Sequence, residues 1–140
     1  MRTWTAVLAL VAAASPLQAP VLRGDGTLRG QGLLRAGADG APAGTLAVIG
    51  SLPVSGEGGL SGQAEAAAHV PVKAGPQGVT GCAPAEGWAE IKDSAGSVVG
   101  TADLSGEVCV QGRAVPVVPN VWKAEVQGPV SLSGELSPNP

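Results

Sequence analysis

Residues 97–111 read SVVGTADLSGEVCVQ, and apolar residues or glycine occupy every even position from Val98 to Val110. Most odd positions of the same stretch are polar. A strict period of two over this length predicts a β-strand with one buried side and one side facing water. We therefore expect the rest of the chain to form a sheet around this stretch.

Similar alternation predicts further strands over residues 22–38, 45–54, 60–72, 88–92 and 121–136. The alanines and glutamate of residues 63–69 also fit a helix, but the period of two favours a strand. A strand of about 14 residues spans roughly 46 Å, so strands of this length must coil or break. We predict an all-β fold: an antiparallel β-sandwich or a small closed β-barrel of six to eight strands.

Stretches rich in glycine and proline predict the connections between these strands. Residues 55–59 are expected to form a hairpin loop that places Val54 opposite Leu60, and Pro53 indicates a sheet edge or a strand end. Residues 73–87 form the longest irregular stretch in this prediction. Residues 112–120 form another connection, because Pro116 and Pro119 interrupt regular pairing.

Residues 1–19 have the features of a secretory signal peptide, and residues 20–140 then form a single all-β domain. Arg2 provides a positive start, and residues 6–14 form a short apolar run followed by small residues. An uncleaved membrane anchor is the alternative, but the run is shorter than the roughly 20 residues that a membrane span needs. The protein is therefore expected in the periplasm, at the cell envelope or in the medium.

The charge and the aromatic content of the predicted mature chain exclude some classes of partner. Seven basic and eleven acidic residues remain after removal of the signal, a net charge of −4. This balance argues against nucleic acid or an anionic membrane surface as the main partner. Trp88 and Trp122 are the only large aromatic residues left, which disfavours stacking platforms for bases or sugars. The high usage of Gly, Ala, Val and Pro suggests a bacterial genome rich in GC.

The two cysteines, Cys82 and Cys109, are expected to form a disulfide bond. An even cysteine count in an exported chain favours this pairing. A metal or redox pair is the alternative, but the spacing is not CxxC and the only histidine is distant in sequence.

A short motif recurs four times with Leu and Gly on the inward phase of the predicted strands: residues 28–31, 60–63, 104–107 and 132–135 read Leu-[Ser/Arg]-Gly-[Gln/Glu]. The unequal steps exclude a fixed-period solenoid. We interpret the motif as a structural device in which Leu fills the core and Gly lets the strand coil or lets another backbone approach. Coincidence in a chain rich in Gly, Leu and Ser is the alternative.

Candidate chemical residues are few, and no catalytic, cofactor-binding or metal-binding residue is predicted. His69 is the only histidine and falls on the outward phase, so a solvated surface role is expected in place of a triad or a zinc site. Arg23-Gly24-Asp25 is an RGD tripeptide, but it lies in a predicted strand and a three-residue match has little specificity.

Charged residues offer two further candidates. Asp103 and Glu107 share a face, but four residues of strand separate them by about 13 Å, too far for a pair of carboxylates in glycoside hydrolysis. Arg23, Arg29 and Arg35, with Lys73, are a candidate anion-binding patch, although a solvated, edge-protecting face is the more ordinary interpretation.

These observations favour a non-enzymatic β-domain that acts by binding or assembly at the cell envelope or outside the cell. Its partner is an unknown protein or envelope component, and residues 73–87 and the sheet edges are the expected contact surfaces. A carrier with a ligand cavity inside a barrel is the second hypothesis. A small outer-membrane β-barrel is the third, although the chain lacks the Tyr and Phe of an aromatic girdle.

Overall fold

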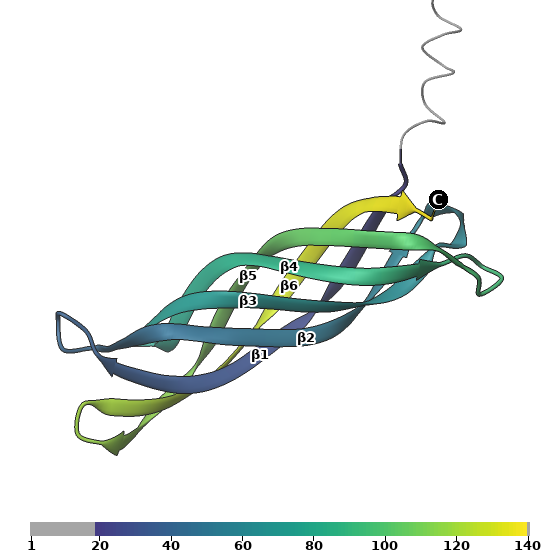
Figure 1. The fold of residues 1–140 in the computed structure, drawn as a ribbon. Helices are drawn as coiled ribbons and strands as arrows, with labels where there is room; N and C mark the ends of the chain where they lie inside the picture. The colour runs from purple at the N-terminus through teal and green to yellow at the C-terminus, as the bar shows by residue number, and fades with distance from the viewer. Residues whose placement is uncertain (1–18, 140) are drawn as a thin grey trace, which may run out of the picture.

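The computed structural model describes residues 19–139, which form a closed barrel of six antiparallel strands (Figure 1). Each strand pairs with the next along the chain, and the last pairs with the first. The strands are β1 (Val21–Ala36), β2 (Pro42–Gly56), β3 (Ser61–Gly75), β4 (Gly78–Lys92), β5 (Val98–Val118) and β6 (Val121–Pro138), with a short 3-10 turn, η2 (Glu57–Gly59), after β2. The all-β prediction is confirmed, and of its two architectures the structure is the closed barrel.

Alternation of side chains along each strand builds the core. Inward residues are apolar or glycine, and among the described residues no buried side chain is polar or charged. Even-numbered residues face inward in β1, β2, β3, β5 and β6, and odd-numbered residues face inward in β4. Leu104, in the middle of residues 97–111, is only 2% exposed. The predicted inward phase is therefore correct from Gly100 to Val110, but Val98, at the start of β5, is exposed.

The glycines of the recurring motif let neighbouring strands approach closely. A Cβ atom built on any of them would lie within 3.0 Å of a backbone carbonyl oxygen of the adjacent strand; these residues are Gly30, Gly62, Gly106 and Gly134. Any larger residue would push the two strands apart, because the obstacle is backbone that cannot rotate away. Inward glycines outside the motif, such as Gly81 and Gly128, lie equally close to a neighbouring carbonyl, so the close approach is a general feature of this barrel and not of the motif alone.

Prolines inside the strands lie where the pairing with one neighbour is interrupted. β3 and β4 are paired as far as Ala67 with Glu86, and pairing resumes at Lys73 with Thr80. Pro71 and Pro84 lie in the gap between these two pairs. A proline has no N–H to donate, so it fits a strand only where a pairing bond is missing. Pro53 likewise lies inside a strand, opposite Gln63, and the prediction of an edge or strand end there is wrong.

Two predicted connections are strands in the structure. Residues 73–87 contain the end of β3 and the first ten residues of β4, so the expected irregular contact loop does not exist. Residues 112–118 continue β5, with a shift of register between Pro116 and Val118. High Gly and Pro content led to both errors, since the coiled strands of this barrel use these residues as well as the turns do.

The predicted pairing across the β2–β3 hairpin is also wrong by two residues. Val54 lies opposite Gly62, and Ser55 lies opposite Ser61. The inward face is unchanged, because a shift by two residues keeps each side chain on the same side of the strand.

The hairpins divide between the two ends of the barrel (Figure 1). The β1–β2, β3–β4 and β5–β6 turns lie at one end, and the β2–β3 and β4–β5 turns lie with the C-terminus at the other. β4 ends its pairing with β5 at Val79 and Gly112, so residues 113–118 of β5 pair with β6 alone. The predicted signal peptide, residues 1–19, lies outside the described residues except for Ala19.

Candidate functional site

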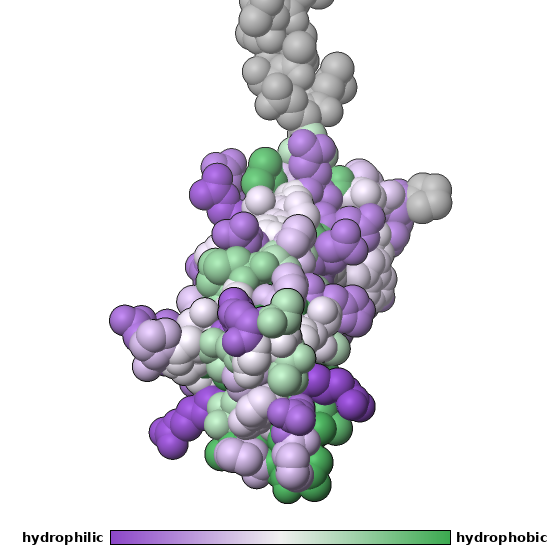
Figure 2. Space-filling view, turned by 90° about the vertical axis from the view of Figure 1, so that its left-hand side faces the viewer, coloured by the Kyte–Doolittle hydropathy of each residue, from purple (hydrophilic) through white to green (hydrophobic). Residues whose placement is uncertain are grey.

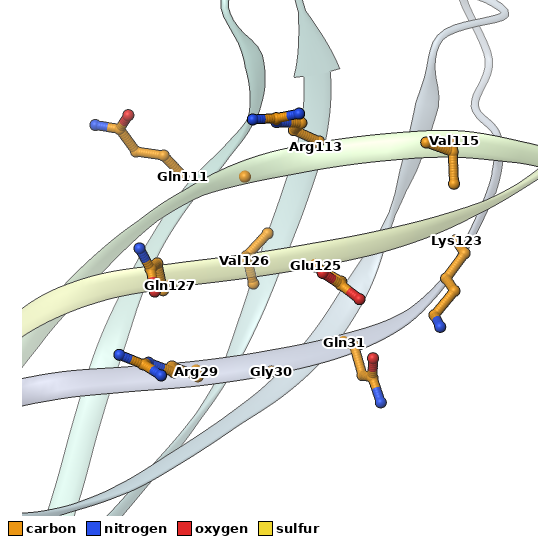
Figure 3. A pocket seen from close by; sticks show the side chains of 11 residues that line it. Arg29, Gly30, Gln31, Gln111, Arg113, Val115, Lys123, Glu125, Val126 and Gln127 are labelled. Carbon is orange, nitrogen blue, oxygen red and sulfur yellow. The ribbon is translucent and has the colours of Figure 1, made fainter.

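An open hollow of about 840 Å³ lies on the outer face of the barrel over β1, β6 and β5 (Figure 3). We call it the outer groove. Its polar side chains are Arg29 and Gln31 of β1, Lys123, Glu125 and Gln127 of β6, and Gln111 and Arg113 of β5, and Val115 completes the wall. Gly30 and Gly112 also line it, so that part of its floor has no side chains.

Strand register brings these residues together from distant parts of the chain. One row across the three strands joins Gln31, Glu125 and Arg113, and the adjacent row joins Arg29, Gln127 and Gln111. All of these positions are on the outward phase of their strands. The groove therefore depends on the closure of the barrel between β6 and β1, which alternation along a single strand cannot reveal.

The groove has a local excess of positive charge. Arg29, Arg113 and Lys123 contribute three cations and Glu125 one anion. Within residues 19–139 the only salt bridge joins Lys73 to Asp39, so none of the groove cations is neutralised by a carboxylate at ion-pair distance. A cationic hollow on a chain with a net charge of −3 over its full length indicates a specific surface and not an overall basic character.

A second hollow of about 510 Å³ adjoins the first. It shares Gln111, Arg113 and Gln127 with the outer groove and extends to Gln77 in the β3–β4 turn and to Thr27. Because they share these residues, the two hollows form one polar surface.

Exposed apolar residues border the groove at the end of the barrel that bears the β5–β6 turn. Leu33 and Val115 are 57% and 55% exposed, and Val117 and Val118 follow in β5. Figure 2 shows hydrophobic side chains gathered at the end remote from the grey N-terminal trace, with hydrophilic ones on either side. Exposed apolar side chains gathered beside a polar groove are typical of a surface that contacts another molecule.

The structure separates the four residues of the predicted anion-binding patch. Arg29 alone lines the outer groove, whereas Arg23 and Arg35 lie elsewhere on β1. Lys73 is paired with Asp39 near the β1–β2 turn. This contact, with a further hydrogen bond from the Ala41 amide, lowers the pKa of Asp39 below its ordinary value of 3.8.

Arg113 and Lys123 were missed by sequence reasoning as partners of Arg29. Both have the outward parity of their strands, which was a usable signal. The sequence predicts an irregular connection over residues 112–120. It therefore gives no β5–β6 register, and this register is what places Arg113 and Lys123 in adjacent rows.

The remaining candidate residues lie on the outer face as predicted. His69 is exposed on β3, and Asp103 and Glu107 are exposed on β5. The RGD tripeptide lies within β1, where Asp25 accepts a hydrogen bond of 2.6 Å from the Ser131 hydroxyl. In the described residues no group of three or more His, Cys, Asp or Glu side chains is arranged to hold a metal ion.

Cys82 and Cys109 form a disulfide bond directly across β4 and β5. Their Cα atoms are 4.0 Å apart, and both residues are exposed. Cys82 is therefore part of a regular strand and not of the irregular stretch predicted over residues 73–87.

Fold and groove together define a closed six-stranded β-barrel with a disulfide and a cationic groove on its outer face. The chain matches no protein-family model and no curated protein in the comparisons made with it. Within residues 19–139, no helix has the length and apolar composition that crossing a membrane requires.

Proposed function

We propose that the protein is an exported, non-enzymatic binding or assembly domain that uses the outer groove to contact a partner bearing carboxylates. The observation that carries this proposal is the set of three cations, Arg29, Arg113 and Lys123, that share one hollow without an ion-pair partner. Arginine binds a carboxylate through two parallel hydrogen bonds, and lysine adds a compact charge. The amides of the groove glutamines supply further donors for the same oxygens.

The disulfide supports the exported part of the proposal. An exposed disulfide persists in oxidising surroundings such as the periplasm or the extracellular medium and is rare in the cytosol. The disulfide is compatible with the periplasm and with the extracellular medium, and we place the partner at the cell envelope.

Packing of the interior favours an outer binding surface over a carrier cavity. Barrels of about eight strands have an interior just wide enough for side chains to fill, and six strands enclose less. Leu28, Val48, Ile91 and Val108 are among the side chains that are fully buried inside this barrel. A small ligand in the interior would have to displace them.

The outer surface favours a barrel surrounded by water over one surrounded by lipid. A membrane barrel presents an apolar band on its outer face. Here the outward positions of β1 and β4 include Arg23, Arg29, Glu86 and Glu90, all exposed. The apolar sides of the strands face the barrel core.

A carboxylate polymer tests the proposal directly. Poly-L-glutamate is titrated into the oxidised mature domain by isothermal calorimetry at about 20 mM and about 500 mM salt. We expect binding at low salt that weakens at high salt and is about tenfold weaker in the triple variant R29Q/R113Q/K123Q.

The matched control is R23Q/R35Q/K73Q, which removes the same formal charge outside the groove. It should bind poly-L-glutamate as the wild type does. Equal weakening in both variants would show that binding follows overall charge, and the absence of any binding by the wild type would refute the proposed function.

A further inference from the structure

A second surface with the opposite charge lies on another side of the barrel. Trp88 projects outward from β4 and is 50% exposed, which is unusual for a large aromatic residue. Glu65 of β3 and Asp103 of β5 lie directly opposite it on the two neighbouring strands. Glu86 and Glu90 flank it on β4, on the same outward face. We call these five residues the Trp88 face.

The carboxylates of the Trp88 face are available to a partner. The only salt bridge in the described part of the chain, Lys73 with Asp39, lies elsewhere. Glu65 accepts a hydrogen bond of 2.8 Å from the Ser51 hydroxyl, which holds it on the outer surface without neutralising it. An aromatic ring among unpaired carboxylates attracts cations by both charge and its π face.

The outer groove and the Trp88 face are complementary in charge and in apolar character. The groove combines three cations with the exposed Val115 and neighbouring Leu33, whereas the face combines four carboxylates with one exposed tryptophan. With about 4.8 Å between strands and about 6.8 Å between alternate residues, the Cα atoms of each charged set are roughly 8 to 14 Å apart. Several ion pairs therefore fit one docking geometry, with the indole against the apolar margin of the groove.

We propose that the partner of the outer groove is the Trp88 face of a second copy of this chain. The inference rests on the proposed function and names the carboxylate-bearing partner of the same groove. Docking places Trp88 against Val115 and brings the flanking carboxylates to Arg113, Lys123 and Arg29. The charges steer the encounter and set its orientation, and the tryptophan supplies the apolar contact that such interfaces depend on.

The two surfaces do not overlap, so assembly continues beyond a pair. The groove spans β5, β6 and β1, and the face spans β3, β4 and β5. Their shared strand, β5, contributes Asp103 to one and Arg113 to the other, ten residues along the chain. A contact between two different surfaces is head-to-tail, and it produces open chains or rings in place of a closed two-fold dimer.

Two half-interface variants test this assembly by sedimentation velocity. The groove variant is R29Q/R113Q/K123Q, and the face variant is W88S/E86Q/E90Q. All of the substituted residues are exposed, so circular dichroism of each variant should match the wild type. V21S, which alters an equally exposed apolar residue away from both surfaces, and R23Q/R35Q/K73Q are the controls.

We expect the wild type and both controls to form species larger than a dimer as the concentration rises from micromolar to millimolar, and to return to monomers at about 500 mM salt. Each half-interface variant alone should stay monomeric. An equimolar mixture should form a heterodimer and nothing larger, because it retains one intact groove and one intact face.

A wild type that stays monomeric at millimolar concentration, or a mixture that stays monomeric, would overturn the self-docking proposal. If poly-L-glutamate still binds the groove in either case, the proposed function stands and the natural partner is another acidic molecule. If poly-L-glutamate fails as well, both proposals fall.

Discussion

Substitution of Gly106 by alanine should destabilise the barrel strongly, although alanine is the smallest possible addition. A Cβ atom at this position would lie within 3.0 Å of the Ser131 carbonyl oxygen on β6. Relief requires β5 and β6 to separate where Gly106 lies opposite Leu132. The obstacle is backbone, so rotation of a side chain cannot relieve the clash.

The expected cost follows from three contributions. Overpacking costs about 1–3 kcal/mol, and one weakened pairing hydrogen bond adds about 1 kcal/mol. The reduced freedom of the unfolded chain returns about 0.4–1 kcal/mol. The net loss in the free energy of unfolding is about 1–3.6 kcal/mol, which for a domain of this size lowers the Tm by roughly 3–18 °C.

Urea and thermal unfolding followed by circular dichroism measure this loss, with Gly75→Ala as the matched control. A Cβ atom at Gly75 would meet nothing within 4 Å, and its φ is not positive. Gly75→Ala should therefore be neutral or stabilising by up to about 1 kcal/mol. If the two variants are equally stable, the close approach of the strands does not explain the recurring glycines.

The remaining predictions concern the disulfide, the core phase and one ion pair. Replacing Cys82 and Cys109 together with serine should lower the free energy of unfolding by about 3–4 kcal/mol in urea titrations, because the bond spans 27 residues of the chain; an unchanged midpoint would contradict this. Leu104→Asp should abolish cooperative melting, since it buries an unpaired carboxylate where leucine is 2% exposed; a normal melting curve would show that the inward phase is wrong. Lys73→Ala should raise the pKa of Asp39, measured by NMR of its carboxyl carbon, back towards 3.8. Because the wild-type pKa is depressed in the folded state, the stabilisation by this pair is present at pH 7 and is lost as the pH falls through that depressed pKa; a loss on raising the pH would contradict the assignment.

Alternation along the strands allowed the fold class and most of the core to be predicted. The even positions from Gly100 to Val110 face inward on the predicted phase, as do those from Leu46 to Val54, whereas Val98 is exposed. The prediction succeeds because a closed barrel buries one face of every strand. Odd or even position within a strand is then enough to tell buried residues from exposed ones. The choice between barrel and sandwich depends on whether β6 pairs with β1, and no local pattern carries that information.

Residues 78–87 and 112–118 show where sequence reasoning failed. In most sheets Gly and Pro mark turns, but here inward glycines such as Gly81 admit a neighbouring backbone, and Pro84 occupies an interruption in pairing. Gly and Pro therefore occur both in turns and inside the strands of this barrel, and only the tertiary structure distinguishes the two cases. The groove was missed for this reason, because Arg113 lies in one of the stretches assigned to a connection.

Mapping of carboxylate binding by NMR tests whether the outer groove is the contact surface of this barrel. The oxidised, ¹⁵N-labelled domain of residues 20–140 is titrated with poly-L-glutamate, and amide shifts are followed for every strand. We predict shifts concentrated at Arg29, Gln31, Arg113, Lys123 and Gln127, with the far side of the barrel around His69 unchanged. Shifts spread evenly over the surface, or confined to residues outside the groove, would show that the outer groove is not the contact surface.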